Sequence, residues 1–197
     1  MSYIGKTPTA VPLTSSDITN GIITTAKIAD DAISAAKLAS GVGGKVLQVV
    51  TDTKTDTFST SSTSFTDVTG LSVAITPSST SSKILVVSHI AIDHGDSRGM
   101  LIQLVRGSTA LHVGDAASNR TRCTLGTESD ENGSNTNFFT GGFQYLDTPN
   151  TVSETTYKLQ ARIGSSNAGF VNRRKVDGDD ANMPRTASGI TVMEIAG

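Results

Sequence analysis

Hydrophobic and polar residues alternate one by one in several short segments after residue 44. The pattern is clearest at Leu71, Val73 and Ile75, and again over 157–163, where every second side chain is apolar. A period of two places alternate side chains on opposite faces of a β-strand. On this basis strands are expected over 45–51, 58–68, 71–75, 83–92, 100–106, 109–113, 121–125, 138–146, 156–163, 169–172 and 190–195.

The segments between these expected strands are short and rich in Gly, Ser, Asn and Pro, and no helical pattern alternates with them. Many short strands joined by such turns are typical of antiparallel sandwiches and jelly rolls, whereas parallel α/β folds need helices between their strands. Segment 83–92 is densely apolar on both faces, which predicts a central strand buried on both sides. The sequence therefore predicts a mainly β fold, with a jelly-roll-like antiparallel β-sandwich over 45–197.

The first 44 residues follow a different pattern. Residues 21–30 and 31–40 are two copies of one ten-residue unit, in which Ile23 matches Ile33 and Ile28 matches Leu38. A degenerate third copy precedes them. The large apolar side chains therefore recur every five residues, at Leu13, Ile18, Ile23, Ile28, Ile33 and Leu38.

A five-residue step matches neither the helical period of 3.6 nor the strand period of 2. It favours short helical pieces that alternate with turns, and the clearest piece would be capped by Asp31 and ended by Gly41. One such piece cannot bury its apolar residue alone, so we expect a stalk in which other copies of the chain supply the neighbours. The alternative interpretation is a single amphipathic helix over 22–39 packed on its own domain. The glycines of 42–44 would form a hinge between a stalk segment, 1–44, and a head, 45–197.

The amino-acid composition argues against several classes of function. The net charge is −2, charged residues make up 17% of the chain, and the basic run 173–175 is followed closely by acidic residues, so no nucleic-acid partner is expected. The single cysteine, Cys123, excludes a disulfide framework within one chain. No apolar run approaches the ~18 residues of a membrane span, and no secretory signal is evident. We therefore expect a protein that is made in a cytoplasm and does not insert into membranes.

Candidate chemistry centres on a few polar residues. His94 with Asp93 and Asp96 could hold a divalent ion, because imidazole and carboxylate groups are common ligands. The favoured interpretation is a polar turn between two strands, since the spacing matches no known ligand pattern. One His per chain could still share an ion near the axis of an oligomer. The polar loops are candidate contact surfaces, and their candidate residues are Asp93, His94, Asp96, Glu128, Asp130, Asn132, Asp177 and Asp179.

An enzyme is the less favoured class. A polysaccharide depolymerase would need a pair of carboxylates in a cleft. Glu128, Asp130 and Glu131 lie close together, but their Gly-, Ser- and Asn-rich setting is typical of a surface loop. No nucleophile motif and no phosphate-binding loop is present, so we expect neither catalytic residues nor a cofactor.

Several stretches resemble one known class of proteins. Residues 4–8 and 17–39, with 45–50, 71–85, 104–110 and 187–196, resemble segments of bacteriophage fibre proteins, especially those of marine phages. The resemblance implies a homotrimer on the virion. Residues 1–44 would be anchored to tail or capsid proteins, and the head would contact polysaccharide on the host surface.

The same resemblance leaves the position on the particle open. The chain is short, with no extended shaft and no large tail-binding domain, so both the tail and the capsid are candidates. Few aromatic residues are available to stack on sugars; they are Tyr145, Tyr157 and Phe170. The alternatives are a capsid-attached fibre or decoration protein without a receptor role, and a lectin-like binding module of cellular origin.

Overall fold

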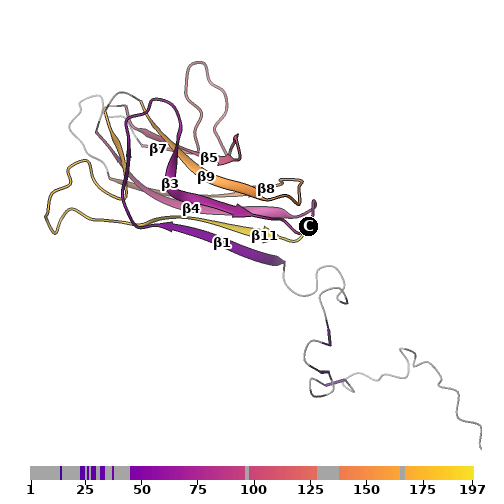
Figure 1. The fold of residues 1–197 in the computed structure, drawn as a ribbon. Helices are drawn as coiled ribbons and strands as arrows, with labels where there is room; N and C mark the ends of the chain where they lie inside the picture. Colours follow the sequence, from indigo (N-terminus) through magenta and orange to yellow (C-terminus); the bar gives the residue numbers. More distant parts are fainter. Residues whose placement is uncertain are drawn as a thin grey trace, which may run out of the picture. The chain divides into compact units, whose positions relative to one another are not determined.

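The computed structural model describes residues 45–95, 98–127, 138–164 and 167–197. It also describes isolated residues of the first 44, namely Thr14, Ile23, Thr24, Ala26, Ile28, Ala29, Ala32, Ile33 and Lys37. The chain divides into two compact units, Met1–Gly44 and Lys45–Gly197. The second unit, called the head below, carries the strands of the described residues (Figure 1).

The strands of the head follow one another along the chain with no helix between them in the described ranges. They are β1 (Val46–Lys54), β2 (Phe58–Thr60), β3 (Thr66–Ile75), β4 (Lys83–His94), β5 (Met100–Arg106), β6 (Thr109–Leu111), β7 (Leu125–Gly126), β8 (Phe139–Asp147), β9 (Thr155–Ile163), β10 (Gly169–Val171) and β11 (Ser188–Ile195).

These strands form two antiparallel sheets. The β4 sheet has the order β1-β11-β4-β10-β2, and β8 also pairs with β4. The β5 sheet has the order β3-β9-β5-β6, and β7 also pairs with β5. In Figure 1, β1, β11 and β4 run side by side as one layer. The predicted mainly β, antiparallel class is confirmed.

One hydrophobic cluster takes side chains from both sheets. Ile84 and Val86 of β4 contribute to it, as do Ile102 of β5 and Leu159 of β9, and all are fully buried. They occupy alternate positions of their strands, as the period of two predicts. Removing this apolar surface from water is the main driving force that holds the two sheets together.

The prediction that β4 is buried on both faces is correct only for its second half. From Lys83 to His89 the strand alternates, with Val87 and His89 exposed, whereas Ile90 to His94 are all buried. The outer face of the second half is contacted by the chain after β10, where the Lys175 amide donates to Asp93. Apolar density along one strand does not reveal which parts of its outer face are covered.

The expected strand over 58–68 is two strands that belong to different sheets. The intervening segment turns at Ser62, whose hydroxyl donates to the Ser64 carbonyl at 2.6 Å and accepts from the Ser64 amide at 3.1 Å. Hydroxyl side chains that bond to nearby backbone compete with strand pairing, so this Ser- and Thr-rich stretch bends instead of extending. Similarly, the expected strand over 121–125 shortens to β7, and the hydroxyl of Thr124 accepts from the Leu104 amide at 2.9 Å.

The predicted helices of the first unit fall mostly outside the described residues. Where that unit is described, the Ala32 amide donates to the Ala29 carbonyl at 3.0 Å, which closes a single turn. Asp31 and Gly41, the expected cap and end of a helix, lie outside the described residues. Across the described residues, no helix has the length and apolar character needed to cross a membrane.

Candidate functional site

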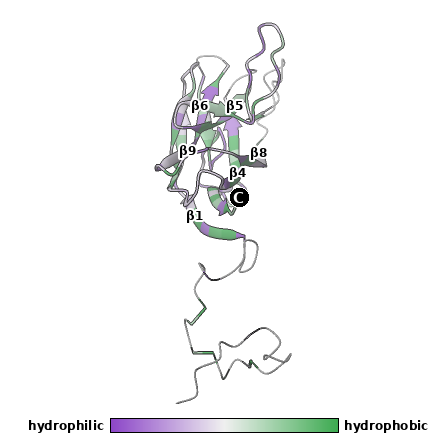
Figure 2. Ribbon diagram, turned by 90° about the vertical axis from the view of Figure 1, so that its right-hand side faces the viewer, coloured by the Kyte–Doolittle hydropathy of each residue, from purple (hydrophilic) through white to green (hydrophobic). Residues whose placement is uncertain are grey.

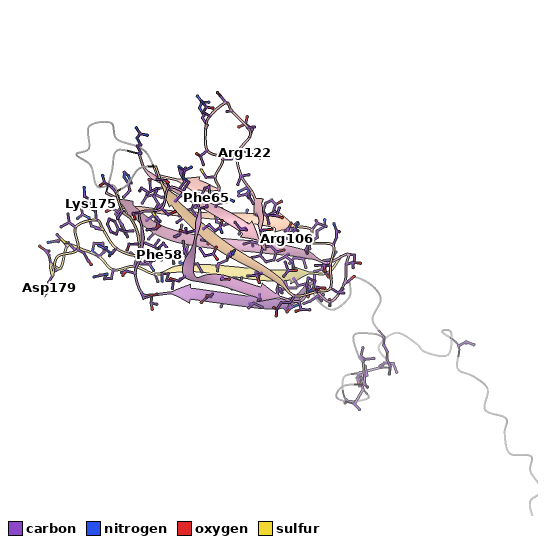
Figure 3. All side chains as sticks on the ribbon, turned by 45° about the horizontal axis from the view of Figure 1, so that its top comes forward. Phe58, Phe65, Arg106, Arg122, Lys175 and Asp179 are labelled. Carbon is purple, nitrogen blue, oxygen red and sulfur yellow. The ribbon has the colours of Figure 1, made fainter. Side chains whose placement is uncertain are left out.

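Among the loops expected to make contacts, the segment that joins β10 to β11, residues 172–187, is described throughout, and it is called the distal loop below. β11 begins at Ser188, which pairs with Lys54 at the end of β1. The distal loop therefore lies at the end of the head opposite Val46, where β1 begins. Figure 3 shows Lys175 and Asp179 at this end, and Arg106 far from them.

Asn172 anchors the start of the distal loop. Its side chain is fully buried, and its amide nitrogen donates to the carbonyls of Lys54 and Asp56 at 2.9 Å each. Its amide oxygen accepts from the Ser188 hydroxyl at 2.6 Å. The backbone has φ 62°, a left-handed conformation in which Asn is more common than most residues. One side chain thus ties together both ends of the loop and the chain that follows β1.

The carboxylate of Asp93 anchors the distal loop to the end of β4. Its carboxylate accepts from the Lys175 amide at 2.8 Å and from the His94 amide at 2.7 Å, while the Lys175 ammonium donates to the Gly95 carbonyl at 3.1 Å. Because these groups pack between β4 and the loop, Asp93 is 0% exposed and His94 is also buried.

The prediction that Asp93 and His94 are exposed contact residues is therefore wrong. β4 continues to His94, and β10 pairs alongside Asp93 and His94. Asp93 and His94 therefore belong to the strand and not to the connection that follows it, and the Asp93 carboxylate makes internal hydrogen bonds. Asp96, the third member of that predicted group, lies outside the described residues. Among the residues that the structure describes, no cluster of His, Cys, Asp and Glu could hold a metal ion.

The exposed part of the distal loop is ordered by its own charges. The Asp177 carboxylate pairs with Arg185 at 2.8 Å and with Arg173 at 3.7 Å. The Asp180 carboxylate accepts from the Asn182 backbone amide at 2.7 Å and from its side-chain amide at 3.0 Å. These bonds hold the loop in a defined shape without burying it.

Asp177 and Asp179 are both exposed, in agreement with the expected surface position of this loop. Figure 3 places Asp179 at the tip, pointing away from the sheets. Carboxylate oxygens accept hydrogen bonds and side-chain amides such as that of Asn182 both donate and accept. The exposed tip of the distal loop therefore carries both hydrogen-bond donors and acceptors.

The aromatic residues considered for stacking on sugars pack against other residues of the head. Tyr157 is fully buried in the core, and its hydroxyl donates to Asp147 at 2.6 Å. Burial and the neighbouring Asp147 raise the pKa of the Tyr157 hydroxyl. Phe170 is 9% exposed, with the Arg173 guanidinium 4.0 Å above its ring, and Tyr145 packs against the core and His112.

Other predicted contact residues fall outside the part of the chain that the structure describes. These are Glu128, Asp130 and Asn132, together with Glu131, and they include the carboxylate cluster considered for a depolymerase. Cys123 is half-buried, and burial raises the pKa of its thiol.

The repeat residues can be compared at only a few positions. Ile23 and Ile33, which match in the repeat, are each 53% exposed in the single chain, and Ile28 is also exposed. Leu13, Ile18 and Leu38 lie outside the described residues. Large apolar side chains at regular spacing, uncovered within one chain, are a surface that another chain can bury.

A cavity that sequence reasoning missed opens at the other end of the head. Its volume is about 350 Å³, and Arg106, Glu154 and segment 149–156 line it. Arg106 is held there by Asp147 at 2.7 Å, the same carboxylate that accepts from Tyr157. Its lining residues come from two separate segments, 106–107 and 149–156, and only the fold brings these segments together.

No protein-family model matches the chain, and no curated protein is significantly similar to it.

Proposed function

We propose that this protein is a homotrimeric fibre protein of a phage particle. Residues 1–44 form the oligomeric, virion-anchoring segment, and the head, a jelly-roll-like β-sandwich, contacts the host surface through the distal loop. The observation that carries this proposal is the repeat: Ile23 and Ile33, which match in the repeat, are equally exposed among the described residues of one chain, and neighbouring chains can cover them.

Three further features support the proposal. The resemblance to phage fibre segments extends from the repeat into the head. The two sheets share one core, which fits a compact head at the end of a stalk. The distal loop lies at the opposite end of the head from Lys45, so a chain anchored through residues 1–44 would present that loop outward.

The oligomer is tested on the full chain by light scattering after size exclusion. A trimer has a mass of 3 × 20.4 = 61.2 kDa. Replacing Ile23, Ile28 and Ile33 together with Ser should lower the mass, because the apolar surface that drives association is removed. Val176→Ser is the matched control, since Val176 is as exposed as Ile23 but lies in the distal loop. A wild-type chain that stays at 20.4 kDa would contradict the stalk.

The virion assignment needs a separate measurement. Antibodies raised against the head should label intact particles of the source phage in immunogold electron microscopy. Labelling at the tail or over the capsid surface decides between the two positions. A trimer that is absent from purified particles would contradict the virion assignment and favour the lectin-like alternative.

The receptor role is tested on an array of bacterial surface polysaccharides. Asp179→Ala combined with Asn182→Ala should weaken binding by about tenfold or more, because each lost hydrogen bond to a ligand costs about 1 kcal/mol. Glu154→Ala is the control, since this exposed carboxylate lies at the other end of the head. A particle-bound trimer that binds no polysaccharide would favour the capsid fibre without a receptor role.

A further inference from the structure

One face of the β4 sheet carries a row of apolar side chains that crosses four strands. Val49 of β1 lies opposite Met193 of β11, Met193 lies opposite Leu85 of β4, and Leu85 lies opposite Leu146 of β8. Residues directly opposite one another in a sheet project to the same face. These four side chains, called the apolar row below, are therefore neighbours on one surface.

The apolar row points away from the core. The adjacent positions Val86 and Val192 are fully buried between the sheets, so the alternating positions Leu85 and Met193 face outward. Val49 is 55% exposed and Leu146 is 48% exposed, although both are apolar. Figure 2 shows hydrophobic colour along much of β1 and β4.

The apolar row itself is uncharged, and the exposed Lys83, two residues before Leu85 on the same face, borders it on one side. The row on its other side is also uncharged. The next row on the same face consists of Thr51, Thr191, Val87 and Gln144. On the outward face of the β5 sheet, by contrast, Lys158 pairs with Asp67 at 2.8 Å, and Gln160 donates to the same carboxylate at 2.7 Å. A centre depleted of charge is what distinguishes the core of a protein interface from ordinary surface.

The apolar surface also extends to the point where the head joins the first unit. Val46 and Leu47, the first two residues of β1, are both exposed. Because Lys45 directly follows Gly44, chains held together along 1–44 would hold these residues close to one another. The row ends in an exposed apolar residue at each edge, Val49 in β1 and Leu146 in β8. A ring of identical subunits joins two different patches of each copy, and the two ends of the row can supply these patches.

We propose that the apolar row is the surface through which the heads of neighbouring copies of this chain pack against one another. The molecule that covers the apolar row is a second copy of the head. In a trimer with a three-fold axis, the apolar row of each head contacts the heads of both other chains. This inference rests on the proposed homotrimer and names the part of the head that belongs to the shared interface.

Methionine oxidation provides a test within one molecule. Met193 in the row and Met183 in the distal loop are both partly exposed in the single chain, and Met100 is fully buried. In the full-length oligomer, peroxide should oxidise Met193 several-fold more slowly than in the chain dissociated by the Ile23, Ile28 and Ile33→Ser changes. Met183 should oxidise at the same rate in both. Equal rates for Met193 in oligomer and dissociated chain would overturn the proposal.

Substitution tests the same surface by an independent route. Val49→Glu and Leu146→Glu in the full chain should raise the concentration at which the oligomer dissociates by about tenfold or more, because each would bury a carboxylate. Val49→Thr keeps the branched shape and strand preference, and should give a smaller shift in the same direction. Val176→Glu is the matched control and should leave the dissociation unchanged.

The outcomes separate this inference from the proposed function. A wild-type chain that is monomeric at every concentration contradicts both. If the Ile23, Ile28 and Ile33 changes dissociate the oligomer while Val49→Glu and Leu146→Glu have no more effect than Val176→Glu, the stalk stands and the head interface is wrong. If the variants at the row dissociate the oligomer and keep the circular dichroism of the wild type, the interface is supported.

Discussion

The backbone amide of Lys175 donates a hydrogen bond of 2.8 Å to the carboxylate of Asp93. This bond joins the distal loop to the end of β4, although 82 positions separate the two residues. It means that the shape of the exposed loop depends on a residue that no ligand can reach.

Asp93→Ala should destabilise the protein by about 1–3 kcal/mol, because the Lys175 amide loses a buried acceptor. Hydrogen exchange should increase first in the distal loop, and urea unfolding should give the change in free energy. Asp179→Ala, an exposed carboxylate in the same loop, should stay within about 0.5 kcal/mol of the wild type. Equal effects of the two substitutions would contradict the anchoring role of Asp93.

Asn172→Ala should cost more, about 2–4 kcal/mol, since it removes three side-chain hydrogen bonds and places Ala at a positive φ. Asn172→Gly also loses the side chain, but it adopts this backbone conformation freely. The glycine variant should therefore be the more stable of the two in thermal denaturation. The reverse order would show that the left-handed backbone contributes nothing to the difference.

Glu194 should make the head sensitive to acid. Burial alone would raise its pKa, but hydrogen bonds from Ser78 and Gln48 outweigh burial and lower the pKa to about 2, below the usual 4.5. The folded-state value is the lower one, so this stabilisation is present above pH 4.5 and is lost as the pH falls toward 2. The loss should be about 3 kcal/mol, at 1.36 kcal/mol for each unit of pKa.

Urea unfolding between pH 7 and pH 2.5 measures this dependence. Glu194→Gln keeps the shape of the side chain and should flatten the profile in the acid range, at the cost of lower stability at pH 7. A wild-type and a Gln variant with parallel profiles would mean that another carboxylate controls acid unfolding.

Tyr157→Phe should destabilise the head by about 1–2 kcal/mol. The substitution leaves the Asp147 carboxylate with its bond to Arg106 at 2.7 Å, but removes the buried donor at 2.6 Å. Tyr145→Phe on β8, in the other sheet, is the control, and should stay within about 0.5 kcal/mol of wild type in the same denaturation experiment. If Tyr145→Phe destabilised the head more than Tyr157→Phe, the Tyr157 hydroxyl would not be the one that stabilises the head.

The local pattern predicted the strands well where alternation is strict. Strand β5 has the expected bounds of 100–106, and β8 and β9 differ from expectation by a residue or so at their ends. Each of these strands has one face against the core, and this burial alone imposes a period of two on the sequence. Prediction failed at 58–68, where serine and threonine hydroxyls bond to the local backbone and the chain passes from one sheet to the other.

The candidate site was predicted in part. The exposed position of Asp177 and Asp179 follows from a polar, Gly-containing run between two strands. The roles of Arg173 and Arg185, which order this loop by pairing with Asp177, could not be predicted, because a charged residue carries no local sign of its partner.

The sequence by itself determined the class of fold, the positions of most strands and the change of period at residue 44, because each of these is imposed by the order of apolar and polar residues along a short stretch. Only the tertiary structure decided that Asp93 and His94 are buried, that Asn172 closes the distal loop, and that Val49, Met193, Leu85 and Leu146 form one row that faces away from the core. The physical reason is that burial and register depend on which distant segments pair, and such pairing is a property of the whole folded chain.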